Sequence, residues 1–154
     1  MNKLNAIEID SAAGSGLIKE LIENGASVPL CITGSSMMPT LKPGRDLVLL
    51  RECSETSFKD GQILLFERSD GSLVLHRIRK TQGEMLVMNG DSQPWCEYIH
   101  KKQAIAFVSH IIRNGKKIEN NCSVAKIWNL LWYPTRPFRP FLKKFRKVFI
   151  PRRK

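Results

Sequence analysis

The chain has 154 residues, 42% of them hydrophobic, and a formal net charge of +11. This length is typical of roughly one domain with a hydrophobic core of its own. No apolar run approaches the roughly 20 residues of a membrane-spanning helix, and none near the start resembles a secretory signal, so we expect a cytoplasmic protein that contacts membranes at most peripherally.

The first predicted element is a short amphipathic helix over residues 15–24. Its apolar residues recur at helical spacing, and Gly25 follows as a C-terminal stop. The apolar residues of this face are Leu17, Ile18, Leu21 and Ile22. We therefore assign residues 1–27 to an N-terminal segment that carries one short helix.

Short apolar runs separated by turn residues begin at Val28, which is typical of β-strands. The runs cover residues 28–32, 46–50, 62–66, 72–78, 84–89 and 105–112. The turn residues Asp70-Gly71 and Gln82-Gly83 predict two hairpins, because glycine tolerates the positive φ that tight turns need. The pattern predicts a mainly β body over residues 28–118.

Residues 119–154 form a basic, aromatic tail. From Ser123 to the end there are ten bases and no acid, which leaves a net charge of +1 for the rest of the chain. The segment VAKIWNLLWY favours a helix that stops at Pro134. We expect the tail to contact an anionic membrane, where each Lys or Arg contributes about 1 kcal/mol. A solvated tail and a nucleic-acid contact are the alternatives, and no nucleic-acid motif accompanies the charge.

The four cysteines are scattered, with no C-x-x-C pair and no nearby histidine cluster. This pattern predicts neither a zinc site nor a redox motif. In a reducing cytoplasm we expect free thiols, although an even number would permit disulfides in an exported protein. The cysteines are Cys31, Cys53, Cys96 and Cys122.

The loop ITGSSMMPTL, residues 32–41, contains more than a turn requires. Glycine, proline and small polar residues suffice for a turn, so the methionine pair and the second serine need another explanation. A serine becomes a nucleophile only with a base within hydrogen-bond reach and donors placed for the oxyanion. Ser36 can meet these requirements if Gly34 allows close backbone approach and Pro39 stiffens the exit of the loop.

Three histidines could supply the base, because imidazole titrates near neutral pH. We favour His76 over His100 and His110, since it lies in a predicted strand of the same body. The alternative is a strand histidine that only satisfies a backbone group. Asp91 and Glu97 follow the next predicted strand, and either carboxylate could orient the imidazole by accepting from its second nitrogen. Asp91 is otherwise a simple turn residue.

Three strings resemble, in order and spacing, the sequence boxes of type I signal peptidases and the related repressor peptidases. They are GSSMMPTL at residues 34–41, VLHRI at 74–78 and NGD at 89–91. The resemblance covers about residues 28–112. It implies a small, highly bent antiparallel β assembly that hydrolyses peptide bonds. Histidine in the second box matches the branch of the endoplasmic reticulum, archaea and sporulating bacteria, whereas the common bacterial enzymes place lysine there.

The resemblance makes Ser36 the nucleophile, with its own backbone N–H in the oxyanion hole, and His76 the base. It places four further residues at the substrate or the oxyanion: Gly34, Ser35, Met37 and Pro39. Asp91 matches the first acid of the third box, and Glu97 lies about where a second acid falls. The implied reaction is acylation of Ser36 and deacylation by a water that His76 activates, with no metal or organic cofactor.

Two departures from this family bear on function. The residue two before the nucleophile is Gly34, which offers no hydroxyl to the oxyanion, and no membrane anchor precedes the body. We expect a cytoplasmic serine endopeptidase that processes a leader or precursor peptide. One alternative is a self-cleaving regulator, but such repressors use a lysine base and carry a DNA-binding domain, for which residues 1–27 are too short. The other is a non-catalytic peptide-binding module of the same fold.

Overall fold

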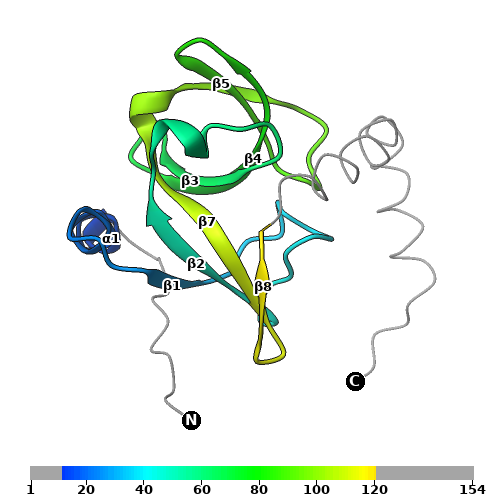
Figure 1. Ribbon diagram of the computed structural model, residues 1–154. Coiled ribbons are helices and arrows are strands. Elements are labelled where there is room, and N and C mark those ends of the chain that lie inside the picture. The colour runs from blue at the N-terminus through cyan, green and yellow to red at the C-terminus, as the bar shows by residue number, and fades with distance from the viewer. Residues whose placement is uncertain (1–11, 121–154) are drawn as a thin grey trace.

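The computed structural model describes residues 12–120, and its mainly antiparallel β architecture confirms the predicted class (Figure 1). The elements are α1 (Ala12–Glu23), β1 (Val28–Cys31), β2 (Asp46–Glu52), β3 (Ile63–Glu67), β4 (Leu73–Gln82), β5 (Met85–Asn89), β6 (Glu97–His100), β7 (Ala104–Arg113) and β8 (Lys116–Glu119). Within this described range, no helix has the length and apolarity needed to span a bilayer. The helix predicted for VAKIWNLLWY, and Cys122, lie outside the described residues.

All eight strands belong to one antiparallel sheet. Their order is β1-β2-β7-β3-β4-β5-β6, and β8 pairs with β7. The two predicted hairpins are confirmed, since β3 pairs with β4 and β4 with β5 across Gly71 and Gly83, both at positive φ. Figure 1 shows how the sheet bends, with β3, β4 and β5 curling at one end and β1, β2 and β8 at the other.

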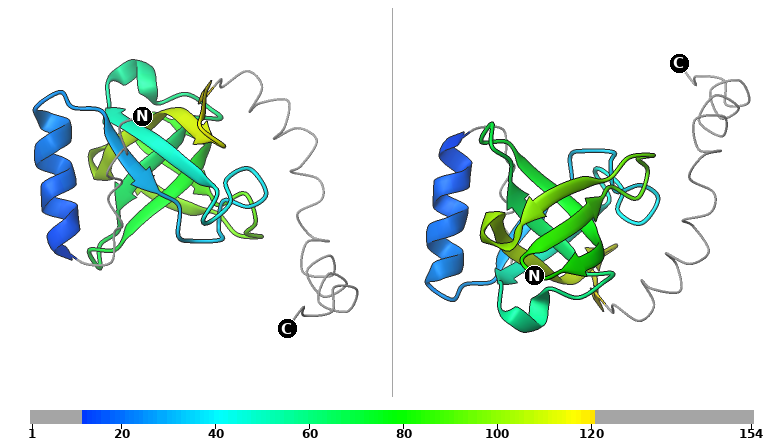
Figure 2. Two further views of the ribbon diagram at one scale, coloured as in Figure 1. Left: turned by 90° about the horizontal axis from the view of Figure 1, so that it is seen from below. Right: turned by 90° about the horizontal axis from the view of Figure 1, so that it is seen from above.

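Two apolar clusters hold this bent sheet together. β3 contributes to both, because alternate residues of its ILLF run point to opposite faces: Ile63 and Leu65 enter one cluster, Leu64 and Phe66 the other. The helix α1, alongside the sheet in Figure 2, buries Ile18 and Ile22 in the first cluster. The N-terminal helix and the β body therefore share one core.

Asp46, at the start of β2, anchors the long loop that precedes it. Its fully buried carboxylate accepts hydrogen bonds from Arg45, from Arg113 of β7 and from the Lys42 N–H. Burial opposes ionisation, but these donors together hold the pKa of Asp46 far below its ordinary value. Arg113 Nη2 also donates to the Thr40 carbonyl at 2.7 Å. The C-terminal half of the loop between β1 and β2 is thus fixed to two strands.

Candidate active site

Ser36 lies in the loop between β1 and β2. The next residue, Met37, has a structural role that accounts for one of the two methionines in this loop. The Met37 side chain is only 2% exposed and belongs to the first apolar cluster. Its carbonyl accepts from the Leu41 N–H at 2.9 Å, which closes a tight turn. Met37 therefore anchors the loop in the core, while Ser36 stays half-buried at the surface of a groove.

A second loop, the turn that follows β5, packs directly on the serine. The Ser92 N–H donates to the Ser36 carbonyl at 2.8 Å, and its hydroxyl donates to the Ser35 carbonyl at 2.9 Å. Figure 1 shows the two loops next to one another. The NGD string thus lies next to the serine string.

Gly90, in this second loop, marks the point where the site converges. A Cβ added there would lie 2.8 Å from the Ser36 carbonyl oxygen and 2.9 Å from His76 Nε2, closer than real Cβ atoms approach other atoms. Only glycine fits without a shift of the neighbouring atoms. The geometry also places His76 Nε2 beside the main chain of Ser36.

His76 projects from β4 with its side chain 1% exposed. Its Nδ1 lies 2.6 Å from Glu97 Oε1 on β6. Because a carboxylate only accepts hydrogen bonds, Nδ1 carries the proton, and Nε2 of the neutral ring is left as an acceptor. Burial lowers the pKa of His76 more than Glu97 raises it, so the pKa lies below the ordinary 6.5. The ring is therefore neutral at physiological pH and available as a base.

Glu97 is held in turn by Arg68, a residue that sequence reasoning missed. Arg68 Nε lies 2.7 Å from Glu97 Oε2, and Nη2 lies 3.0 Å from Oε1. Burial would raise the pKa of Glu97, but the hydrogen bond from Arg68 and the contact with His76 lower it, so the carboxylate is ionised. Arg68 follows β3 directly at the start of a turn, where sequence alone indicates a solvated base.

Asp91 has a different role from Glu97. Its side chain is fully buried and pairs with Arg77, with Nε–Oδ1 at 3.0 Å and Nη2–Oδ2 at 2.8 Å. Arg79 approaches Oδ1 at 3.4 Å, and Arg77 Nη1 donates to the Gly61 carbonyl. The sequence left open which acid supports the histidine. The structure brings Glu97, and not Asp91, into contact with the imidazole.

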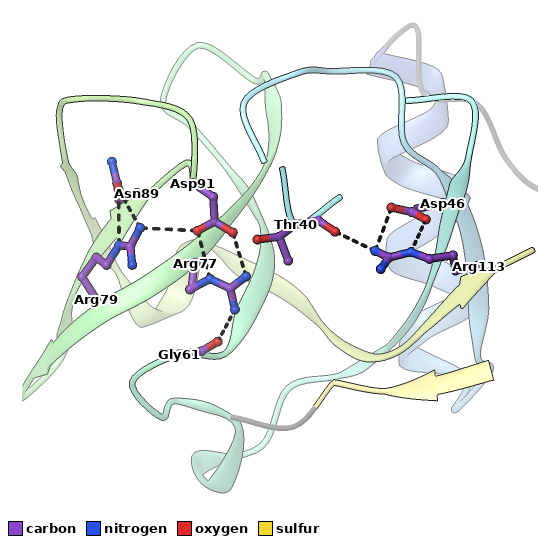
Figure 3. Close-up of polar contacts among 8 residues, drawn as sticks. All are labelled: Thr40, Asp46, Gly61, Arg77, Arg79, Asn89, Asp91 and Arg113. Atoms are coloured by element: carbon purple, nitrogen blue, oxygen red, sulfur yellow. Dashed lines mark hydrogen bonds and ion pairs between the residues drawn. The ribbon is translucent and has the colours of Figure 1, made fainter. Parts of the chain in front are cut away.

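The loop that carries the serine runs between two arginine–aspartate groups. Figure 3 shows Thr40 between the Asp91–Arg77 pair on one side and the Asp46–Arg113 pair on the other. Among the described residues the buried Thr40 hydroxyl has no hydrogen-bond partner, whereas the Thr40 carbonyl accepts from Arg113. Asp46 thus restrains the serine loop through the Lys42 N–H and through Arg113, and Asp91 lies on the other side of Thr40.

A groove of about 710 Å³ passes in front of Ser36 and His76. Gly34 and Met37 line it, as the resemblance implies, and so do Arg68 and Gln93. Ser35 and Pro39 do not belong to its lining. The Ser35 carbonyl accepts the Ser92 hydroxyl hydrogen bond that joins the two loops, and Pro39 follows a cis peptide bond. Apolar walls come from residues Leu30, Ile32, Leu65, Leu73 and Leu75.

Two further findings concern cofactors and relatives. Across residues 12–120, no three His, Cys, Asp or Glu residues come together in a way that could hold a metal ion. Comparison with models of protein families and with curated protein sequences found no match for the chain.

The different partners of the two acids predict different effects on stability. Asp91→Asn leaves the buried Arg77 charge without its counter-charge and should destabilise the fold by about 3–5 kcal/mol. Glu97→Gln affects a partly exposed pair and should cost about 1 kcal/mol or less. Urea unfolding of both variants measures the difference in free energy of unfolding. Equal losses in the two variants would contradict the structural role given to Asp91.

Proposed function

We propose that the protein is a serine endopeptidase of the signal peptidase type, in which Ser36 is the nucleophile and His76 its general base. One observation carries the proposal: a buried imidazole bonded through Nδ1 to Glu97, with Nε2 beside the Ser36 main chain. The lowered pKa of His76 keeps the ring neutral, the contact of Nδ1 with Glu97 leaves Nε2 as the acceptor, and the ionised Glu97 stabilises the imidazolium that forms during the reaction.

Each step then has a named group. The Ser36 Oγ attacks the scissile carbonyl and transfers its proton to His76 Nε2, which passes it to the leaving amine. Water, deprotonated by the same nitrogen, attacks the acyl-enzyme; the bond to Ser36 Oγ breaks, His76 returns the proton to Oγ, and the second product leaves. The resemblance assigns the oxyanion to the Ser36 N–H. The chemistry needs only side chains and main-chain groups of this chain.

The strand edges beside the groove support a peptide as substrate. Ile32 N–H donates to Asp46 O, so the alternation of an antiparallel ladder directs the main-chain groups of Cys31 away from β2 and toward the groove. On the other wall, Leu73 to Leu75 pair with β3, and the pairing of β4 with β5 begins only at Arg77. An extended peptide between these two edges would add as a strand, with its backbone held by both.

The biological setting is proposed from the sequence. The resemblance favours removal of a leader or maturation of a precursor, and the basic tail favours work in the cytoplasm at an anionic membrane surface. A peptide bound in the groove would present one carbonyl to Ser36, so cleavage at defined positions is expected rather than general digestion.

Sequencing of new N-termini tests the proposal. A peptide library is incubated with the wild-type protein, with Ser36→Ala, and with Ser69→Ala, which removes an exposed serine outside the groove. We expect cuts at defined positions from the wild type and from Ser69→Ala, and none from Ser36→Ala. If the wild type leaves the library intact and binds some members as tightly as Ser36→Ala does, the protein is a binding module and the proposal is wrong.

The pH dependence of cleavage reports on His76. Only the neutral imidazole can accept the serine proton, so kcat/KM should rise with pH through the pKa of His76, with its acid limb below pH 6.5. Glu97 raises this pKa, so Glu97→Gln should move the limb to still lower pH. Glu97→Gln should also reduce the high-pH plateau of kcat/KM by on the order of 10²-fold, because the imidazolium loses its counter-charge. If the acid limb of kcat/KM stays at the same pH in Glu97→Gln, the assigned contact between His76 Nδ1 and Glu97 is contradicted.

A further inference from the structure

Among the described residues, two sets of basic side chains contact the acids of the candidate site. Arg77 and Arg79 pair with Asp91, and Arg68 pairs with Glu97. The main chain of Arg68 is fixed by the β3–β4 turn, because its N–H donates to the Ser72 carbonyl and its carbonyl accepts from the Gly71 N–H, both at 3.0 Å. The Arg68 guanidinium thus extends from a main chain that is held in place, although the Arg68 side chain is 37% exposed.

The planar guanidinium contacts both oxygens of Glu97. Oε2 accepts from Nε, and Oε1 accepts from Nη2 while also receiving His76 Nδ1–H. Such a bidentate pair fixes the plane of the carboxylate as well as its distance. This matters because Glu97 lies on β6, a four-residue end strand of the described sheet that pairs with β5 alone. Without the bidentate pair with Arg68, the Glu97 carboxylate could rotate about its side-chain bonds.

The orientation of the imidazole depends on the orientation of this carboxylate. Three charged groups act on His76: Glu97 from β6, Arg68 from the β3–β4 turn, and Asp91 after β5. Among the described residues, Glu97 is the charged group that contacts Nδ1 of the ring, and Asp91 is engaged with Arg77. If the Glu97 oxygen moved away from Nδ1, the neutral ring could carry its proton on Nε2 instead. That tautomer cannot accept the proton of Ser36.

We propose that Arg68 is a positioning residue, which holds the Glu97 carboxylate in the one orientation that keeps the proton of His76 on Nδ1 and leaves Nε2 as the acceptor for Ser36. The proposal rests on the proposed function for its catalytic meaning. Its structural content, the control of a histidine tautomer by an arginine in a neighbouring turn, is measurable without any substrate. A side chain that served only to attach the turn to β6 would affect stability and leave the tautomer unchanged.

The test is NMR of ¹⁵N-histidine-labelled full-length protein, in which ring nitrogen shifts report the tautomer of neutral His76. We expect the Nδ1–H form in the wild type and a mixture of both tautomers in Arg68→Ala. Arg68→Lys retains the charge but not the planar guanidinium that contacts both Glu97 oxygens, so we expect a mixture of tautomers there as well. This variant carries the test if Arg68→Ala fails to fold. Lys19→Ala removes a base beside the same turn without touching Glu97 and should behave as the wild type.

Kinetics of the same variants supply the second readout. Once a cleaved peptide is known, kcat should fall by roughly 10- to 100-fold in Arg68→Ala and Arg68→Lys, with a smaller change in KM, because misorientation affects the reacting groups. A wild-type tautomer in both Arg68 variants would overturn the proposal. A mixed tautomer in a protein that cleaves nothing would support the positioning role and contradict the proposed peptidase, so the two failures are distinguishable.

Discussion

The buried ion pair between Arg77 and Asp91 is the constraint on which the site depends. Arg77 comes directly after His76 on β4, so the same strand that presents the imidazole to the groove presents a guanidinium to its other side. The Asp91 carboxylate accepts hydrogen bonds from that guanidinium, and this pairing fixes the turn after β5. Through Gly90 and Ser92, this turn contacts the main chain of Ser36. One pair thus sets the distance between the serine loop and His76.

The arrangement separates rigidity from reactivity. Two fully buried aspartates with arginine partners lie on either side of the serine loop (Figure 3). The groups assigned to the proposed chemistry lie nearer the groove, where Glu97 and Arg68 are partly exposed and the buried His76 belongs to the lining. Preorganisation of this kind is what a general base requires, because small displacements of the reacting atoms are costly to the rate.

Much of the fold followed from hydrophobic periodicity. The helix and six strands match apolar runs of the sequence, whereas β6 and β8 are four-residue strands, EYIH and KKIE, without such a run. The site was harder to predict, because its contacts join residues distant in the chain. Whether Asp91 or Glu97 meets the histidine depends on where the curled sheet places β6. Arg68 carries no local signal, since an arginine in a polar turn is ordinarily solvated.

The central claim, that Ser36 and His76 act as one catalytic unit, is tested most directly by kcat for Ser36→Ala, His76→Ala and the double variant on one identified peptide. Each single change should remove nearly all cleavage, and the double variant should be about as slow as either single variant, because a base without its nucleophile has no proton to accept. Losses that multiply in the double variant would show that the two residues act independently and would contradict the account.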